Sequence, residues 1–330
     1  MGSIREGKSL FAEGKIKNNM EEIIAPVPKA KIKAELNKDT FLRYTNFGAN
    51  EIYIINHKNS PNTLQEIGRL REITFRAAGG GTGKSIDIDD FDISENPYEQ
   101  LIVWDPEAEL ILGGYRFVHC IDTRDEKGEY HLATTELFDF SDEFKQNYLP
   151  YILELGRSFV QPEYQSSKAG RKGLFALDNL WDGLGALAVN SPKTKYFYGK
   201  VTMYTSYNQL ARDYLLFFLD KYFGDKDGLI TPKIPLGYFN PKEIIAKKFT
   251  GKNYKDDYKI LSKIVRELKE NIPPLINSYM NLSPTMRSFG TATNEGFGGV
   301  EETGILIRID DIYPEKKERH IKSYLKQIRK

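Results

Sequence analysis

The chain has 330 residues, of which 40% are hydrophobic and 12% aromatic, which is enough apolar surface for a packed core. Its 47 Lys and Arg residues nearly balance its 46 Asp and Glu residues, so no global field draws it toward nucleic acid. Cys120 is the only cysteine and the four histidines are scattered. We therefore expect neither an intramolecular disulfide nor a bound metal, and a reducing compartment.

The N-terminus and the hydropathy of the chain indicate a cytoplasmic protein. Its first ten residues lack the apolar stretch of a signal peptide. No segment approaches the roughly 18 apolar residues that a membrane span requires. Peripheral contact with the inner face of a membrane stays compatible with this composition.

The first half of the chain predicts a loose arm, a helix and an antiparallel meander. Residues 1–45 are rich in Lys and Glu, and we expect an N-terminal arm with a short helix near residues 20–24. Ser60 and Pro61 open a helix that ends at the glycines from Gly79 onward. The strands expected at 100–104 and 109–121 are joined by a connection too short for a crossover helix, so we expect them to be antiparallel. The expected strands lie at residues 51–56, 100–104, 109–121 and 130–137.

The second half predicts one strand, a basic glycine-rich loop, and then alternating helices and strands within a single domain of residues 46–330. The whole order predicts an α/β (α+β) fold with a single mixed, mostly antiparallel sheet flanked by helices, and not a doubly wound sheet. The expected elements are a strand at 151–160, the loop at 166–173, a helix at 174–189, a strand at 195–203, a helix at 208–223, a Lys-rich helical excursion at 231–271, a helix at 274–282 and a strand at 304–310.

Residues 78–85, with the sequence AGGGTGKS, match a relaxed phosphate-binding loop. A working loop of this kind leaves a strand and opens a helix, so that backbone N–H groups meet the phosphates. Here a helix precedes the loop, and the acidic run 87–92 follows it, where carboxylates would repel a triphosphate. That run also lacks the glycine and glutamate of a calcium-binding EF-hand. We expect a connecting loop and no nucleotide hydrolysis.

Four pieces of sequence, in a fixed order, carry a resemblance to a known family. They are Arg71 with Phe75 on one helical face, Asp89-Asp90-Phe91-Asp92, Gly113-Gly114-Tyr115-Arg116-Phe117, and Glu154-Leu155-Gly156-Arg157-Ser158-Phe159-Val160. The set resembles the acyl-homoserine-lactone synthases and, more closely, the hemolysin-like N-acyltransferases of the GNAT superfamily that make lyso-ornithine and lyso-glycine lipids. The resemblance runs from Thr63 to His320. It is nearest to Bacteroidetes-type proteins, through the strings LGRSFVQPEY at 155–164 and LDNLWDGLG at 177–185.

The resemblance implies a GNAT fold in which two central strands splay apart. It implies transfer of a 3-hydroxyacyl group to the amine of a small amino acid, glycine in the Bacteroidetes-type relatives, giving a lyso-aminolipid. The donor would be a phosphopantetheine thioester on acyl carrier protein, or acyl-coenzyme A, and no cofactor would be tightly bound. The splayed strands would be those at 151–160 and 195–203, with the pantetheine arm paired to the first.

We expect the donor at the end of the first splayed strand and at the basic loop after it. The glycines of the loop allow close backbone approach, and its cations attract phosphate at the start of the next helix. The loop departs from the usual GNAT signature, Gln/Arg-x-x-Gly-x-Gly/Ala, which favours a carrier protein over free coenzyme A. The expected acyl-donor-binding residues are Ser158, Phe159, Val160, Lys168, Gly170, Arg171, Lys172 and Gly173.

Glu154 is the candidate general base, with Arg116 and Arg157 as the other catalytic candidates. Glu154 and Arg157 are three residues apart, so on a regular strand they point to opposite faces and share a pocket only if a β-bulge intervenes. In the alternative interpretation, these charged residues form an ion-pair network that joins the helix, the acidic run and the sheet. The expected substrate-binding residues are Arg71, Phe75, Asp89 and Asp92.

Two rival functions stay open: a non-catalytic acyl- or lipid-binding protein of the same fold, and a lactone synthase acting on S-adenosylmethionine. The presence of the whole charged set argues against the first. Lactone synthases are shorter and do not need the 231–271 excursion, which argues against the second. Lysines of this excursion predict a docking face for an acidic carrier protein or anionic lipid headgroups, with a solvated helical face as the alternative. The lysines of this expected docking face are Lys242, Lys247, Lys248, Lys252 and Lys255.

Overall fold

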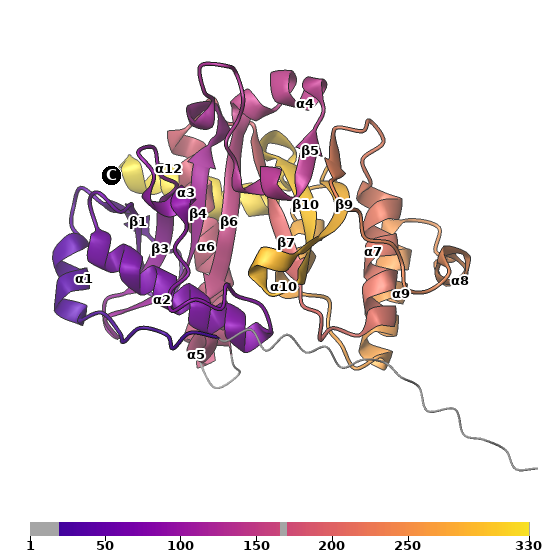
Figure 1. Cartoon of the computed structure of the whole chain (residues 1–330), viewed down its shortest axis with the longest axis horizontal. Helices are drawn as coiled ribbons and strands as arrows, with labels where there is room; N and C mark the ends of the chain where they lie inside the picture. The colour runs from indigo at the N-terminus through magenta and orange to yellow at the C-terminus, as the bar shows by residue number, and fades with distance from the viewer. Residues whose placement is uncertain (1–19, 166–169, 330) are drawn as a thin grey trace, which may run out of the picture.

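A large, mostly antiparallel sheet forms the frame of the protein (Figure 1). The computed structural model describes residues 20–165 and 170–329. The eight strands run in the order β1-β2-β3-β4-β6-β7-β10-β9, and β6 with β7 is the one parallel pair of neighbours among them. Their bounds are β1 Phe41–Tyr44, β2 Glu51–Ile55, β3 Glu99–Asp105, β4 Leu110–His119, β6 Ile152–Val160, β7 Tyr196–Met203, β9 Arg287–Asn294 and β10 Val300–Arg308.

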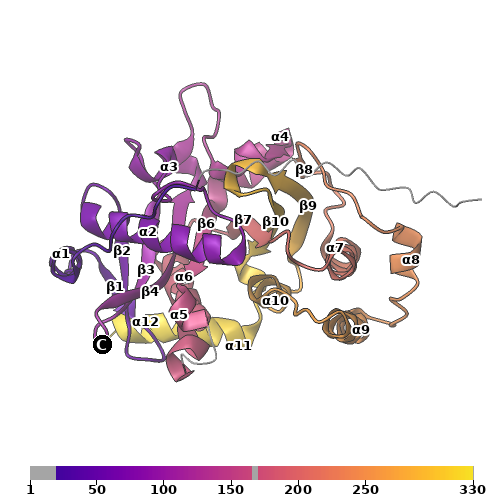
Figure 2. The same ribbon diagram turned by 60° about the horizontal axis from the view of Figure 1, so that its bottom comes forward.

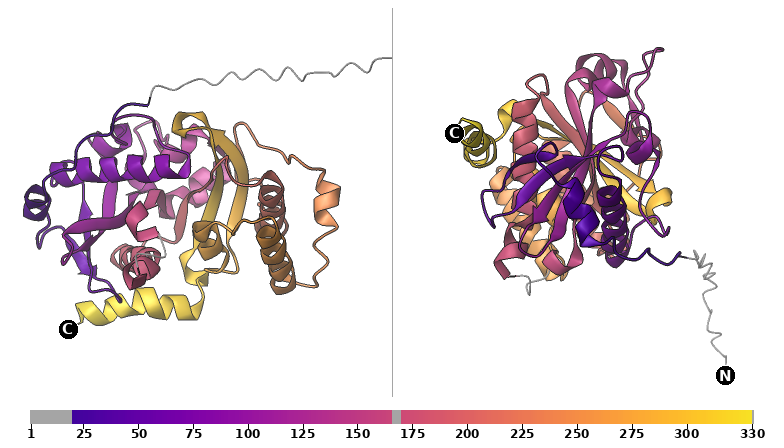
Figure 3. Two further views of the ribbon diagram at one scale, coloured as in Figure 1. Left: turned by 90° about the horizontal axis from the view of Figure 1, so that it is seen from below. Right: turned by 90° about the vertical axis from the view of Figure 1, so that its left-hand side faces the viewer.

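Helices cover both faces of this sheet, which confirms the predicted architecture. Helix α2 (Pro61–Ala78) lies on one face and α6 (Gly170–Asn190) on the other (Figure 3). Helix α7 (Gln209–Phe223) packs beside α9 (Tyr254–Glu267), beyond the β9 edge (Figure 2). The remaining helices are α1 Lys29–Glu35, α3 Asp90–Ile93, α4 Asp142–Asn147, α5 Pro162–Gln165, α8 Lys242–Ala246, α10 Pro274–Met280, α11 Pro314–Lys317 and α12 Ser323–Ile328.

The two faces of the sheet build separate apolar cores. The α2 core joins Leu64 and Ile67 of the helix to Ile102 of β3, all fully or almost fully buried. The α6 core joins Leu180 and Leu184 to the opposite side of the sheet. Both helices present an apolar stripe at intervals of three and four residues, which is why their existence could be read from the sequence. Among the described helices, none is long and apolar enough to cross a lipid bilayer.

The glycine-rich loop after α2 closes on a carboxylate of its own helix. Gly79, with φ of 96°, ends α2 in the left-handed conformation, as predicted. The buried carboxylate of Glu72 accepts hydrogen bonds from the backbone N–H groups of Thr82 and Gly83, at 3.0 and 2.8 Å. Those donors, which a phosphate would need, are therefore taken by Glu72. No helix follows until α3, so the expectation of a connecting loop is confirmed.

The N-terminal segment differs from its prediction. Residues 20–24 form no helix, because their backbone pairs with the glycine-rich loop: Glu21 N–H donates to Gly83 and Ile24 N–H to Ser85. The helix of this region is α1, which starts directly after Pro28. Residues 41–44, assigned to the arm, form edge strand β1 because they pair with β2.

Two strand predictions also need correction. Residues 130–137 form no strand; a 3₁₀ turn at Ala133–Glu136 replaces it, because the backbone N–H of Thr134 donates to Glu154. The short strand β5 (Phe138–Phe140) follows and pairs with β8 (Ile230–Pro232), adding a small second sheet to the single one expected. Strand β9 was missed because its sequence, RSFGTATN, lacks an apolar alternation.

Candidate active site

The central parallel strands β6 and β7 separate partway along their length. Their pairing begins at Ile152 with Tyr196 and ends at Leu155 with Gly199. Beyond that point a cavity of about 460 Å³ opens between them. It reaches both faces of the sheet, because Phe75 of α2 and Leu177 of α6 both line it. The predicted splay is thus present and forms a cavity at the centre of the molecule.

A β-bulge in β6 lies at the start of the splay. Residues 114 and 116 of β4 face residues 159 and 156 of β6, so β6 carries one extra residue there. The bulge includes Arg157, whose φ of 48° is a left-handed conformation uncommon for residues other than glycine. Gly113 allows the close approach of β4, since a Cβ atom would lie 2.3 Å from the carbonyl oxygen of Phe159. Through this bulge, Glu154 and Arg157 both line the cavity, which the sequence allowed only if a bulge intervened.

Behind the cavity lies a buried ion-pair network centred on Arg71. This guanidinium is fully buried and contacts the Asp92 carboxylate at 3.0 Å and the Gln100 side-chain oxygen at 2.5 Å. It also donates to the backbone oxygen of Asp87. Asp92 is available there because it forms a capping box with Asp89 at the start of α3. The acidic run is therefore a helix start fixed by an arginine of α2.

Arg116 and Arg157 join the same network from the sheet. Arg116 Nη1 lies 2.7 Å from both carboxylate oxygens of Asp89, and its guanidinium packs against the Phe91 and Tyr98 rings. Burial by itself would lower the pKa of Arg116, but Asp92 and Asp89 raise it above its usual range. Arg157 Nε lies 3.0 Å from Asp87 and its guanidinium lies over the Phe297 ring. The network's three arginines and three aspartates balance in formal charge.

Of the seven residues expected to be catalytic or substrate-binding, the structure places four on the cavity wall and three behind it. Glu154, Arg116, Arg157 and Phe75 line the cavity. The other three, Arg71, Asp89 and Asp92, make the ion-pair contacts that hold the arginines in place. The ion-pair network that the sequence offered as an alternative interpretation is therefore present, and it supports the cavity wall.

Glu154 is buried and held by donors that the sequence analysis did not identify. Its carboxylate accepts hydrogen bonds from the Tyr98 hydroxyl and from the backbone N–H of Thr134 (3.0 Å) and its hydroxyl (2.5 Å). Burial and the negative charge of Glu154 raise the pKa of Tyr98 well above its usual value, so this phenol stays a donor. A carboxylate has about four lone-pair sites, so these three donors leave about one acceptor site on a carboxylate that lines the cavity. No local motif marks Tyr98 or Thr134.

The expected donor-binding residues divide between the cavity wall and the start of α6. Ser158, Phe159 and Val160 line the cavity. Lys168 lies outside the described residues. The remaining four, Gly170, Arg171, Lys172 and Gly173, form the first turn of α6, which begins at Gly170 and not at the expected residue 174. Their side chains also lie outside the description, but Ala176 and Leu177 of the next turn line the cavity.

A second ion pair on the opposite wall was also missed. Lys200 of β7 and Glu302 of β10 both line the cavity, and their Nζ and Oε2 atoms lie 3.0 Å apart. Asn294 donates to the same Glu302 oxygen at 2.9 Å. Burial by itself would raise the pKa of Glu302, but the charge of Lys200 lowers it below its usual value. The sequence signal that could have pointed to Lys200 is strand periodicity, which puts residues 200, 202 and 204 on one face.

Comparison with known proteins identifies the family of this chain. Residues 70–172 match the acetyltransferase (GNAT) domain family. A glycine N(alpha)-acyltransferase of Phocaeicola vulgatus is 60% identical over 93% of this chain and 95% of its own length. One from Bacteroides thetaiotaomicron is 59% identical over 93% of this chain and 91% of its own. No solved structure matches. The chain belongs to the GNAT family of N-acyltransferases, as the resemblance implied, and is an acyltransferase.

The ion-pair network predicts a pH-dependent contribution of Asp89 to stability. Burial by itself would raise the pKa of Asp89, but the charge of Arg116 lowers it below the ordinary value. Its contribution is therefore complete above the unfolded pKa of about 3.9 and disappears as the pH falls through the lower folded pKa. We expect Asp89→Asn to lower the free energy of unfolding by about 2 kcal/mol at pH 7, with a smaller difference from wild type in acid.

Urea unfolding of both proteins across the acid range measures this difference. Asp122→Asn, at an exposed position, serves as the control and should change stability by less than about 0.5 kcal/mol at any pH. A difference for Asp89→Asn that stays constant into strong acid would show that the charge of Asp89 contributes nothing.

Proposed function

We propose that the protein transfers a fatty acyl group, 3-hydroxylated as the resemblance implies, from a thioester to the amine of glycine, giving a lyso-aminolipid. The observation that carries this proposal is the cavity at the β6–β7 splay, which joins a charged region to an apolar one. Two relatives at about 60% identity that are named for glycine acylation support glycine as the acceptor.

The donor has a suitable place along β6. Past Leu155 this strand stays paired with β4 on one side but no longer with β7 on the other, so its backbone groups face the cavity. A pantetheine arm carries amide groups and can add to such an edge as a further strand does. Apolar side chains for the acyl chain line the same cavity: Leu155, Phe159, Val160, Leu177, Pro274 and Leu275. The donor phosphate would lie at the N-terminus of α6.

The proposed transfer uses backbone groups of β6 and the side chain of Glu154. The amine nitrogen attacks the thioester carbonyl carbon, and backbone N–H groups of β6 stabilise the negative charge on the carbonyl oxygen. The C–N bond forms, the C–S bond breaks, and the thiolate leaves with the electron pair. Glu154 accepts the proton lost by the amine, directly or through one water, at its remaining lone pair. Arg116 and Arg157 lie on the same wall, where the aspartates of the network hold their guanidinium groups in place.

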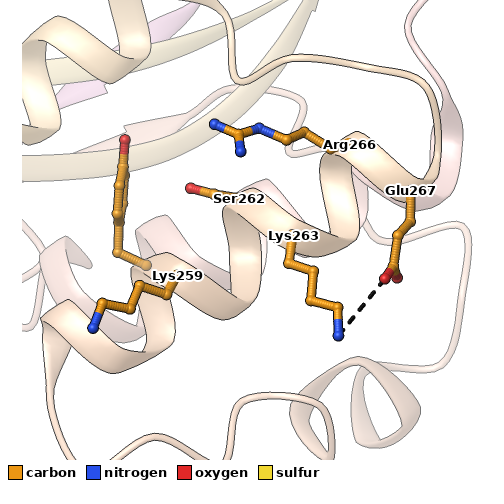
Figure 4. Close-up of a pocket in the computed structure, with 6 residues that line it drawn as sticks. Lys259, Ser262, Lys263, Arg266 and Glu267 are labelled. Atoms are coloured by element: carbon orange, nitrogen blue, oxygen red, sulfur yellow. Dashed lines mark ion pairs between the residues drawn. The ribbon is translucent and has the colours of Figure 1, made fainter.

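Acyl carrier protein is the donor partner that the surface favours. Helix α9 carries exposed cations at intervals of four residues, Lys255, Lys259 and Lys263. Figure 4 shows Lys259, Lys263 and Arg266 around a shallow hollow on this helix, with Glu267 in an ion pair with Lys263 at 3.8 Å. The chain runs from α9 directly to Pro273 and Pro274, which line the cavity. A basic face at this position is complementary to an acidic carrier protein. The same cations could also bind anionic lipid headgroups. The proposed enzyme would then work in the cytoplasm, in contact with the inner face of the membrane.

The proposed reaction is tested with purified protein, 3-hydroxyacyl carrier protein or the matching acyl-coenzyme A, and a panel of amino acids. Mass spectrometry should identify the N-acylglycine as the main product. Formation of no amide with any amine would refute the enzymatic proposal and leave acyl binding as the function. Conversion of S-adenosylmethionine to a lactone would favour the synthase alternative.

Glu154→Gln should lower kcat for glycine by about 100-fold, as expected when a general base is removed, and leave KM for the donor unchanged. Glutamine is close in shape to glutamate, so a cooperative thermal transition measured by circular dichroism serves as the control for folding. Full activity of this variant would exclude Glu154 from the chemistry while leaving the donor site and the reaction as proposed.

Reversing the three exposed charges of α9, with Lys255→Glu, Lys259→Glu and Lys263→Glu together, should raise KM for acyl carrier protein by about tenfold because complementary charge becomes repulsive. KM for acyl-coenzyme A should stay the same. The same reversal of three other exposed lysines, Lys38, Lys127 and Lys322, is the matched control. Equal effects of the two triple variants would show that α9 is not the docking face.

A further inference from the structure

Beyond its last pair with β6, strand β7 presents one face to the cavity. Lys200 and Thr202 occupy alternate positions of this strand, Tyr204 follows directly after it, and all three line the cavity. Thr202 is directly opposite Glu302 of β10, and Lys200 is next along the same face. The cavity therefore has two charged walls: β6 with the arginines and Glu154, and β7 with β10, which carry the Lys200–Glu302 pair.

The cations lining the cavity differ in how far their hydrogen-bonding capacity is used. Arg116 and Arg157 each contact two aspartates of the buried network. Lys200, among the described residues, forms an ion pair with one carboxylate, that of Glu302. An ammonium has three N–H donors, so Lys200 retains donors for a ligand. Its side chain is 11% exposed, which makes a carboxylate bound there largely shielded from water.

The position of Lys200 also fits the geometry of the transfer. Gly199 is the last residue of β7 paired with β6, so Lys200 is the first one across the gap from the bulge at Gly156 and Arg157. The donor thioester is proposed to lie along that part of β6. In an α-amino acid a single carbon separates the carboxylate from the amine. A carboxylate bound to Lys200 would therefore hold the amine in the gap, facing the thioester.

We propose that Lys200 binds the carboxylate of the acceptor, and that Glu302 is a positioning residue that holds the Lys200 ammonium on the cavity wall. The acceptor class is then the free α-amino acid, and amines without a carboxylate are poor substrates. This inference rests on the proposed acylation of glycine and names the group that selects the acceptor.

The test compares glycine with glycinamide, which has the amine but not the carboxylate charge, at a fixed concentration of acyl donor. Wild-type protein should prefer glycine. Lys200→Met should raise KM for glycine by about 10- to 100-fold, the loss expected for one charge-assisted hydrogen bond, and leave glycinamide within about twofold. Lys195→Met is the control: the Lys195 ammonium lies over the Tyr151 ring, and its loss should leave KM for both glycine and glycinamide unchanged.

Glu302→Gln separates this role from a purely structural ion pair. If the pair only stabilises the sheet, both variants should lose activity toward glycine and glycinamide alike, and that result would overturn the inference. If Lys200 binds the acceptor and Glu302 positions it, Glu302→Gln should raise KM for glycine by less than Lys200→Met does, leave glycinamide unchanged and so keep part of the preference, whereas Lys200→Met loses it. Should Lys200→Met not fold, because it leaves Glu302 buried and unpaired, the double variant Lys200→Met/Glu302→Gln replaces it and must lose the preference.

The outcomes distinguish failure of this inference from failure of the proposed function. Wild-type protein that acylates glycine and glycinamide equally well retains the proposed reaction and overturns the role of Lys200. Wild-type protein that acylates neither one refutes the reaction itself.

Discussion

The end of hydrogen bonding between β6 and β7 is the constraint on which the site depends. Up to Leu155 and Gly199 the two strands belong to one continuous sheet, and beyond them the sheet divides. Each strand then lacks a partner strand on the side of the gap, and backbone groups there are costly to bury unless a side chain, a ligand or water satisfies them. The division thus creates both the cavity and a demand for a partner with amide groups. The proposed pantetheine arm would meet that demand, which would explain why a binding cleft can lie within a sheet.

The buried ion-pair network keeps this division in one geometry. Its arginines come from α2, β4 and β6, and its aspartates come from the segment around α3. Burying such charges carries a large desolvation cost, so they do not make the fold stable merely by being paired. Their directional contacts instead hold the helix, the acidic run and the bulged strand in one register. The left-handed backbone of Arg157 is held in the same way, because its guanidinium pairs with Asp87 and lies over the Phe297 ring.

Most of the fold near the site could be predicted because its signals are local. Helix α2 follows from its apolar spacing and from Gly79, and the β3–β4 hairpin follows from a turn too short for a helix. The bulge could be stated only as a condition, because Glu154 and Arg157, three residues apart on one strand, share a pocket only if it is present. Strand β9 and the turn at Ala133–Glu136 could not be predicted, since a neighbouring strand in one case and Glu154 in the other determine their conformation.

The sequence by itself determined the family, the reaction class and the residues that form the charged wall, because an ordered set of side chains carries that information without coordinates. Tertiary structure alone decided which of them reach the cavity. Arg71, Asp89 and Asp92 resemble the other site residues in sequence, yet they lie behind the wall because α2 and α3 pack there. Lys200 and Glu302 carry no motif, and they meet because β7 and β10 are neighbours in the sheet although about a hundred residues apart in the chain. Such contacts depend on strand order, which residue spacing does not encode.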